Sequence, residues 1–287
     1  MRIVRATELG MCFGVRDALQ MTREVSDPAQ VTIHGELVHN PIVIRQLHAA
    51  GFEQAPEDQR QSLASTPLVL ITAHGISNAE RKRLAAGGKQ MIDTTCPLVR
   101  RAHAAAMELA AEDRHVLLIG NPGHVEVRGI VEDLDSCDVI ANPQQVQRYQ
   151  SQRLGIVCQT TMPAPLLAEI RACIAARNPA ADIRFVDTVC HPTKRRQLAM
   201  LDLIRRVDAV VVVGGRNSNN TRRLAEFCRQ RNVPAFHVTC AEEIEPQWFG
   251  NAPTVGLTAG TSTLDETIDE VQERLEQIAD GNRTRAC

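Results

Sequence analysis

Three of the nine cysteines share a chain context that suits iron–sulfur chemistry. Cys12, Cys96 and Cys190 each follow an apolar segment and precede a segment with helical periodicity. The positive end of a helix dipole stabilises a thiolate at such a position. Three thiolates can hold a cubic 4Fe–4S cluster and leave its fourth iron without a protein ligand. Such an open iron can act as a Lewis acid toward a substrate oxygen and as an electron relay.

The alternative for any one of these cysteines is that it packs in the core as a small apolar residue, which is the more common role of a lone cysteine. The same residue at the same position of three repeats argues against it, because packing alone has no need of such a recurrence. The remaining cysteines lack a repeat partner, and we expect no role in the site for Cys137, Cys158, Cys173, Cys228, Cys240 or Cys287. The chain has no Cys-x-x-Cys pair, so cysteine spacing alone is a weak signal for a metal.

Polar residues follow the predicted strands at positions that suit an anionic ligand. Imidazole, hydroxyl and amide groups can donate hydrogen bonds to phosphate oxygens, and helix N-termini add backbone N–H groups. The set comprises His39, His74, His124, Ser218, Asn220 and Ser262. For any single histidine the alternative is a surface or capping residue. Together the six side chains predict a phosphate-binding pocket.

Glu126 lies two residues beyond His124 and is the candidate proton donor. A carboxyl group enclosed near anionic phosphate should have a raised pKa and can then deliver a proton. Thr160, in the loop after a later strand, can relay it. The competing interpretation, which we weigh equally on the residues alone, is a helix-start carboxylate favoured by the dipole.

A threefold internal repeat positions these groups. From each cysteine a helical segment leads to a β-branched run that ends in a glycine 23 or 24 residues later: Gly35, Gly120 and Gly214. Such short apolar runs are typical of buried parallel strands. Ligands of parallel sheets bind beyond the carboxyl ends of the strands, where the polar residues lie. We therefore predict an α/β protein of three units with small parallel sheets, spanning 1–95, 96–189 and 190–280, and a flexible tail at 281–287.

Composition excludes several other classes of protein. The chain has 287 residues, 32 basic and 34 acidic, and only 3% aromatic residues, so neither a basic surface nor stacking platforms for nucleic acid are expected. No apolar run approaches the roughly 20 residues of a membrane span, and no secretory leader is visible. With free thiols also expected, we predict a cytoplasmic protein.

In this order the motifs resemble the 4-hydroxy-3-methylbut-2-enyl diphosphate reductases of the methylerythritol phosphate pathway. The resemblance covers nearly the whole chain and is specific as a set, although no single motif is. The segments that carry it are Gly10–Val15, Val38–Pro41, Ala73–Gly75, Asp93–Val99, Gly123–Val127, Gln159–Thr161, Cys190, Asn217–Asn220 and Thr258–Ser262.

The resemblance implies three α/β units arranged as a trefoil around one 4Fe–4S cluster per chain, with Cys12, Cys96 and Cys190 as its ligands. It implies that Glu126, Thr160 and His124 are catalytic. It also implies that the diphosphate is held by His39, His74, His124, Thr160, Ser218, Asn219, Asn220 and Ser262, with Thr161 and Thr193 in support. The chain departs from the family pattern at Asn219, where serine is common, and at Leu264, where proline is common.

The reaction implied is removal of the hydroxyl group from an allylic diphosphate, giving isopentenyl and dimethylallyl diphosphates, with ferredoxin or flavodoxin as the electron donor. Two alternatives stay open. A non-catalytic iron–sulfur sensor would need the cluster and not the phosphate pocket. A cluster-free transferase acting on a phosphorylated metabolite would need the pocket and not the repeated cysteines.

Overall fold

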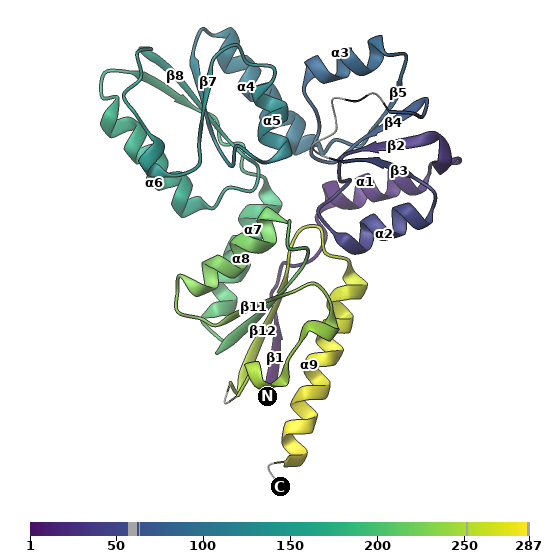
Figure 1. The fold of residues 1–287 in the computed structure, drawn as a ribbon. Helices are drawn as coiled ribbons and strands as arrows, with labels where there is room; N and C mark the ends of the chain where they lie inside the picture. The colour runs from purple at the N-terminus through teal and green to yellow at the C-terminus, as the bar shows by residue number, and fades with distance from the viewer. Residues whose placement is uncertain (57–61, 63, 251, 286–287) are drawn as a thin grey trace. The chain divides into compact units, whose positions relative to one another are not determined.

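The computed structural model describes residues 1–56, 62, 64–250 and 252–285, and side chains as far as Gly281. Helices interleave with three parallel sheets of four strands each (Figure 1). The predicted α/β class with small parallel sheets is therefore confirmed. No helix among the described residues has the length and apolar character needed to span a membrane.

The three sheets have the same strand order. One sheet is β3-β2-β4-β5, the second β7-β6-β8-β9 and the third β11-β10-β12-β1. The strands of the first are β2 (Val31–His34), β3 (Glu53–Ala55), β4 (Leu68–Ile71) and β5 (Gln90–Asp93). Those of the second are β6 (His115–Ile119), β7 (Cys137–Ile140), β8 (Arg153–Cys158) and β9 (Asp182–Phe185). Those of the third are β10 (Ala209–Val213), β11 (Ala235–Val238), β12 (Thr254–Ala259) and β1 (Arg2–Arg5).

Strand β1 lies in the sheet formed by the C-terminal part of the chain. Its residues Arg2–Arg5 pair in parallel with Thr254–Leu257 of β12. The sequence predicts a first unit of 1–95 that includes this segment, because the segment precedes Cys12 along the chain. In each sheet one edge strand leads into a cysteine: β5 into Cys96, β9 into Cys190 and β1 into Cys12. These strands pair with β4, β8 and β12, and β1 alone of the three comes from the N-terminus.

Helices occupy equivalent places in the three repeats. The helices that follow the cysteines are α1 (Phe13–Arg23), α4 (Pro97–Ala111) and α7 (His191–Ile204). Those after the glycine loops are α2 (Pro41–Ala49), α5 (Val125–Val131) and α8 (Asn219–Arg229). Those after β4, β8 and β12 are α3 (Asn78–Ala86), α6 (Ala164–Arg177) and α9 (Asp265–Arg285). Short 3-10 turns lie at Pro28–Gln30, Pro143–Gln145, Ala241–Glu243 and Pro246–Trp248.

The described chain divides into two compact bodies. The first, called body 1, comprises 1–13, 39–42 and the described part of 191–287, and it contains the sheet of β10, β11, β12 and β1. The second, body 2, comprises 14–38 and 43–190 and contains the other two sheets. The boundaries of the three predicted units, and their arrangement around a common centre, stay predictions.

The core consists of the central strands with their covering helices. All five residues of β10 are buried, as are all four of β2 and the last four of β6. Burial on both faces explains the continuous β-branched runs, since no face of these strands meets water.

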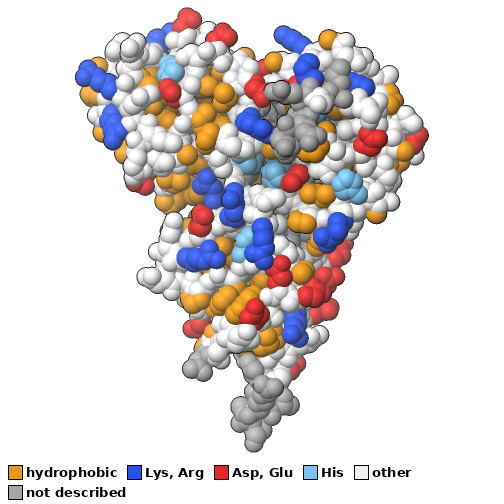
Figure 2. Space-filling view, in the orientation of Figure 1, with side chains coloured by type: hydrophobic (Ala, Val, Ile, Leu, Met, Phe, Trp, Pro, Cys, Tyr) orange, Lys and Arg blue, Asp and Glu red, His pale blue; other side chains and the backbone are white. Residues whose placement is uncertain are grey.

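Helix α9 extends further than the sequence suggested. Residues 281–285, expected to be part of a flexible tail, continue this helix, and 286–287 lie outside the described residues. Ile268, Val271, Leu275 and Ile278 pack on the sheet with helical spacing. Acidic side chains line its outer face (Figure 2).

Two glycines let the cysteine-linked helices approach the sheets closely. A Cβ atom at Gly155 of β8 would lie 2.9 Å from the Cβ of Leu109 on α4, and one at Gly256 of β12 would lie 3.0 Å from the Cδ2 of Leu203 on α7. Each leucine stands 13 residues after its cysteine. The repeat thus extends to packing, because helix and strand meet through the same leucine–glycine contact.

We predict that Gly155→Ala lowers the free energy of unfolding by about 1–3 kcal/mol through overpacking against Leu109. Leu109→Ala alone should cost about 2–5 kcal/mol through the cavity it leaves. Because the new methyl group enters that cavity, the double variant should lose less than the sum of the two, which urea unfolding of all four proteins would measure. Additive losses would show that the glycine contact does not set the helix–sheet distance.

Candidate functional site

The loops before Cys96 and Cys190 share one hydrogen-bonding scheme, within body 2. The backbone N–H of Cys96 donates to the carbonyl of Ala73 at 3.1 Å, and that of Cys190 donates to the carbonyl of Thr160 at 2.9 Å. Ala73 and Thr160 each stand two residues beyond the end of the neighbouring strand, β4 or β8. Each cysteine is thereby fixed at the carboxyl edge of its sheet, directly before a helix.

The shared Asp-Thr-x-Cys sequence explains the shape of these loops. The Oδ1 of Asp93 accepts from the backbone N–H of Thr95 at 3.0 Å, and the Oδ1 of Asp187 accepts from that of Val189 at 3.1 Å. The Thr94 hydroxyl donates to the carbonyl of Ile71, the last residue of β4. The Thr188 hydroxyl donates to the carbonyl of Cys158, the last residue of β8. The aspartate closes the turn and the threonine ties it to the sheet.

Cys12 shows the same anchoring within body 1. Its backbone N–H donates to the carbonyl of Thr261 at 3.2 Å, two residues beyond the end of β12. All three cysteines are partly exposed, and each directly precedes a helix, as predicted. The other described cysteines have no such anchoring in common.

Gly14 makes room for the thiol of Cys96. A Cβ atom at position 14 would lie only 2.5 Å from the Cys96 sulfur and 3.1 Å from its Cβ. Because real Cβ atoms do not approach so closely, any side chain at position 14 would displace this thiol. The sequence analysis did not single out Gly14, although it lies in the Gly10–Val15 motif.

In body 1 the predicted phosphate-binding residues cluster around the start of α8. Ser218 caps the helix, its hydroxyl accepting from the N–H of Thr221 at 3.3 Å, and Asn220 is 7% exposed. The Ser262 hydroxyl donates to the carbonyl of His39 at 3.2 Å, and the Asn40 amide donates to the carbonyl of Ser262 at 2.6 Å. A Cβ atom at Gly215, before Ser218, would lie 2.5 Å from the carbonyl oxygen of His39. The structure therefore brings the His39, Ser218–Asn220 and Ser262 segments together within this body.

The two positions that depart from the family pattern, and Thr193, are also in body 1. The Asn219 side-chain oxygen accepts a hydrogen bond from Arg222, one turn further along α8. Leu264 is 6% exposed, directly before α9. Thr193 is buried in the first turn of α7. None of these features removes a donor from the start of α8.

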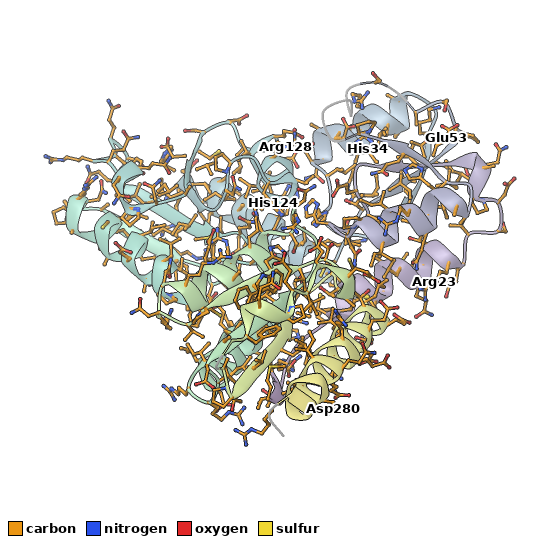
Figure 3. The ribbon with its side chains drawn as sticks, turned by 60° about the horizontal axis from the view of Figure 1, so that its bottom comes forward. Arg23, His34, Glu53, His124, Arg128 and Asp280 are labelled. Atoms are coloured by element: carbon orange, nitrogen blue, oxygen red, sulfur yellow. The ribbon has the colours of Figure 1, made fainter. Side chains whose placement is uncertain are left out.

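In body 2, His74 and His124 lie edge to face, with ring centroids 5.5 Å apart. His124 caps helix α5, and its Nδ1 accepts from the backbone N–H of Glu126 at 3.2 Å. Nδ1 is then the unprotonated nitrogen of the neutral ring and Nε2 carries the proton. Figure 3 labels His124, which caps this helix, and Arg128, which lies in its last turn.

Glu126 and Thr160 form a buried pair. The backbone N–H of Thr160 donates to one carboxyl oxygen of Glu126 at 2.7 Å, and its hydroxyl donates to the other at 2.8 Å. Burial raises the pKa of Glu126 to about 7, even though both hydrogen bonds from Thr160 favour the ionised form. A carboxyl group with this pKa can hold and release a proton at neutral pH.

Several buried donors near these residues have no hydrogen-bond partner among the described residues. They include the Thr161 hydroxyl and the Gln159 amide nitrogen in body 2 and the Asn220 amide nitrogen in body 1. Because a buried unpaired donor costs free energy, such groups mark places where a ligand or water supplies the missing acceptor. Gln159 was not among the predicted site residues. Its membership of the Gln159–Thr161 motif was the only signal for it.

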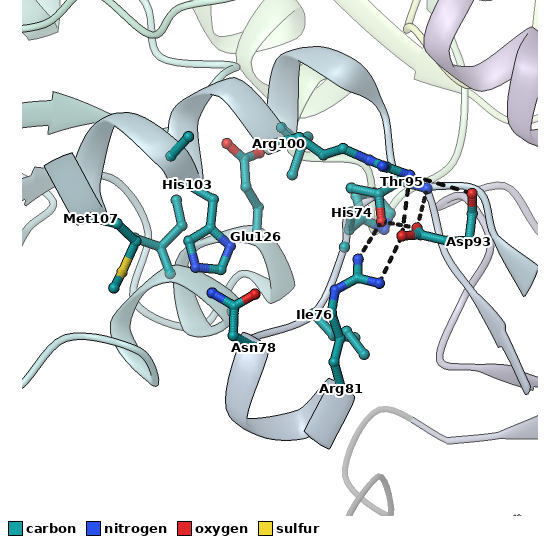
Figure 4. A pocket seen from close by; sticks show the side chains of 15 residues that line it. His74, Ile76, Asn78, Arg81, Asp93, Thr95, Arg100, His103, Met107 and Glu126 are labelled. Atoms are coloured by element: carbon teal, nitrogen blue, oxygen red, sulfur yellow. Dashed lines mark hydrogen bonds and ion pairs between the residues drawn. The ribbon is translucent and has the colours of Figure 1, made fainter. Parts of the chain in front are cut away.

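An ionic network and a cavity adjoin the Cys96 loop. The second carboxyl oxygen of Asp93 lies 2.7 Å from Arg81 and 3.1 Å from Arg100. Burial opposes ionisation, but hydrogen bonds from Arg81 and Thr95 hold the pKa of Asp93 below its usual range. A cavity of about 320 Å³ opens beside these groups and reaches His74 and Glu126 (Figure 4). The sequence analysis assigned no role to Arg81, Arg100 or this cavity.

The chain matches a family model described as LytB protein over residues 3–276. It is 32% identical over 286 residues to the 4-hydroxy-3-methylbut-2-enyl diphosphate reductase of Aquifex aeolicus, covering 97% of each chain. It is 35% identical over 282 residues to the protein of that name from Pelobacter propionicus, covering 97% of this chain and 99% of the relative.

Two solved structures share the fold. The E-1-hydroxy-2-methyl-but-2-enyl-4-diphosphate reductase of Plasmodium falciparum superposes with a TM-score of 0.87 at 25% identity, covering 95% of this chain and 87% of that one. An (E)-4-hydroxy-3-methyl-but-2-enyl diphosphate reductase, called the terminal enzyme of the non-mevalonate pathway, superposes with a TM-score of 0.66 at 30% identity, covering 96% and 100%.

The raised pKa of Glu126 predicts a pH-dependent stability. Between the ordinary value of 4.5 and about 7 the folded protein binds this proton more tightly than the unfolded chain. Stability from this group is therefore present at low pH and is lost as the pH rises through about 7. Relative to Glu126→Gln, which keeps both contacts with Thr160, the unmodified protein should lose about 3 kcal/mol between pH about 4 and about 8. Urea unfolding at the two pH values measures this difference, and parallel pH profiles would contradict the assignment.

Proposed function

The chain belongs to the LytB protein family, and from this we propose that it is a 4-hydroxy-3-methylbut-2-enyl diphosphate reductase. The reaction takes up two electrons and two protons and breaks the C–O bond of the allylic alcohol. The hydroxyl group leaves as water, and a proton added to carbon gives isopentenyl or dimethylallyl diphosphate. The Glu126–Thr160 pair is the observation that carries the proposal, because it provides a buried acid beside phosphate-binding loops.

We propose Cys12, Cys96 and Cys190 as the ligands of one 4Fe–4S cluster. The donor set fits, since all three thiols are partly exposed, each cysteine stands directly before a helix, and the backbone N–H of each donates to the loop after a neighbouring strand. The space that Gly14 leaves for the Cys96 sulfur supports the same assignment. When bound, the cluster would supply single electrons and an iron that no protein residue ligates.

The diphosphate of the substrate is held by the loops described above. We assign its binding to His39, His74, His124, Thr160, Ser218, Asn219, Asn220 and Ser262, with Thr161 and Thr193 in support. The unpartnered donors of Asn220 and Thr161 support this, since phosphate oxygens would accept from them. The capped start of α8 adds backbone N–H groups.

Proton transfer is assigned to Glu126. With a pKa of about 7 the carboxyl group is protonated in about half of the molecules at neutral pH. The Thr160 hydroxyl orients it and provides a path for the proton toward the leaving hydroxyl group. His124 holds the Glu126 backbone through Nδ1 and offers its Nε2–H to the substrate.

The remaining partners follow from the reaction. Single electrons must come from a one-electron carrier, and we propose a ferredoxin or flavodoxin. A cytoplasmic location suits free thiols and an oxygen-sensitive cluster, because that compartment is reducing.

Glu126→Gln should bind the allylic diphosphate and turn it over at least about 100-fold more slowly, because the amide cannot donate the proton. Anaerobic assays with a chemical reductant would give the rate, and calorimetry the binding. Glu273→Gln, an exposed change on α9, serves as the matched carboxyl-to-amide control and should leave the rate unchanged. Unchanged turnover by Glu126→Gln would remove it as the proton source.

Gly14→Ala should lower the iron bound per chain after anaerobic reconstitution, because the new methyl group meets the Cys96 sulfur. Gly281→Ala, where no heavy atom lies within 4 Å of the added Cβ, is the control and should bind as much iron as the unmodified protein. Full iron content in Gly14→Ala, with the fold intact by circular dichroism, would contradict the placement of Cys96 as a ligand.

A further inference from the structure

The cavity beside the Cys96 loop runs from the surface of body 2 to Glu126. Its rim carries exposed residues, namely Asn78, Arg100 and Ala104. Its inner wall includes Glu126, which is 3% exposed, and His74. Figure 4 shows His103 and Asn78 on one side and Arg81, Asp93 and Arg100 on the other. We propose that this cavity is the water-filled passage by which protons from solvent reach Glu126, with His103 as the relay on its wall.

The inference rests on the proposed function, because it takes Glu126 to lose a proton in every turnover. A buried acid that donates a proton must be reprotonated before the next cycle. Both carboxyl oxygens of Glu126 are engaged by Thr160, and its side chain is closed to bulk solvent. A route for protons through the protein is therefore required, and the cavity reaches the residue that needs it.

The size and lining of the cavity suit a chain of water molecules. About 320 Å³ is roughly ten times the volume of one water molecule in the liquid. Water in a cavity needs polar partners, and the walls present the side chains of Asn78, Thr95, Arg100 and His103. A dry cavity would be lined by apolar groups alone.

His103 lies beside Asp133 on the wall of the cavity. Its Nε2 lies 2.7 Å from a carboxyl oxygen of Asp133. Asp133 is itself fixed, because it accepts from the backbone N–H groups of Asn78 and Ala79 at the start of α3. Histidine is the side chain whose charge ordinarily changes near neutral pH, so it can take a proton from water and pass it on.

Asp93, Arg81 and Arg100 are the other charged groups that face the passage. Asp93 accepts from Arg81, Arg100 and Thr95, which keeps it ionised and unsuited to carrying a proton. His74 also lines the cavity, edge to face with His124. We place the relay at His103, which lies on α4 next to the rim residue Ala104.

Exchange of the Glu126 proton for deuterium tests the passage without any turnover. The reconstituted protein, kept anaerobic and free of substrate, is mixed with heavy water, and the infrared C=O band of the protonated carboxyl group is followed. Glu126→Gln identifies the band by removing it. Ala104→Phe places a ring at the rim, and Ala111→Phe places the same ring on an exposed position of α4 outside the cavity lining.

We expect Ala104→Phe to slow this exchange at least about tenfold, because exchange then requires local opening of the structure. Ala111→Phe should exchange as fast as the unmodified protein. Equal rates in all three would overturn the proposal while leaving the proposed function untouched. Absent turnover by the unmodified loaded enzyme would instead overturn the proposed function, and the exchange rates would still report on the passage.

His103→Gln tests the relay separately. Glutamine can keep the contact with Asp133 but carries no titratable proton. We expect kcat to fall with KM unchanged, most strongly at high pH where solvent protons are scarce, and imidazole in the buffer to restore it. A pH profile identical to that of the unmodified enzyme, or a loss that imidazole does not restore, would overturn the role of His103.

Discussion

The site depends on one backbone hydrogen bond that recurs three times. In each repeat the N–H of a cysteine donates to a carbonyl two residues beyond the end of the neighbouring strand. This bond fixes the cysteine at the carboxyl edge of a parallel sheet, and the helix that follows begins there. Aspartate and threonine side chains close the same turn before Cys96 and Cys190. The loops after β4, β8 and β12, which supply the accepting carbonyls, also carry three of the proposed substrate-binding residues, His74, Thr160 and Ser262.

The burial of Glu126 is the second feature on which the proposed site depends. Enclosing Glu126 raises its pKa to about 7, against the pull of two hydrogen bonds from Thr160. The same residues therefore set both the orientation and the protonation of the acid. A carboxyl group buried in this way is closed to bulk solvent. The polar cavity that reaches Glu126 is the proposed path by which it regains a proton. In the loop after β8, Thr160 contacts both a proposed cluster ligand and the proposed acid. Its carbonyl accepts from the N–H of Cys190, and its own N–H and hydroxyl donate to Glu126.

Local sequence was enough to predict the repeat, the buried parallel strands and the helix that follows each cysteine, because these depend on periodicity and on neighbouring residues. The sheet to which β1 belongs was missed, since its pairing with β12 joins residues some 250 positions apart. The contacts of Asp133 with α3 and His103, and of Arg81 with Asp93, were missed for the same reason. Gly14 shows its role only when the position of the Cys96 sulfur is known.

The central claim is that three equivalent cysteines hold one cluster in a reductase. The most direct measurement is iron and acid-labile sulfide per chain after anaerobic reconstitution, in the unmodified protein and in Cys12→Ser, Cys96→Ser and Cys190→Ser. We expect about four of each in the unmodified protein and a loss in all three variants, with Cys173→Ser unaffected. An unmodified protein without iron would contradict the account and favour a cluster-free transferase that uses the same phosphate-binding loops.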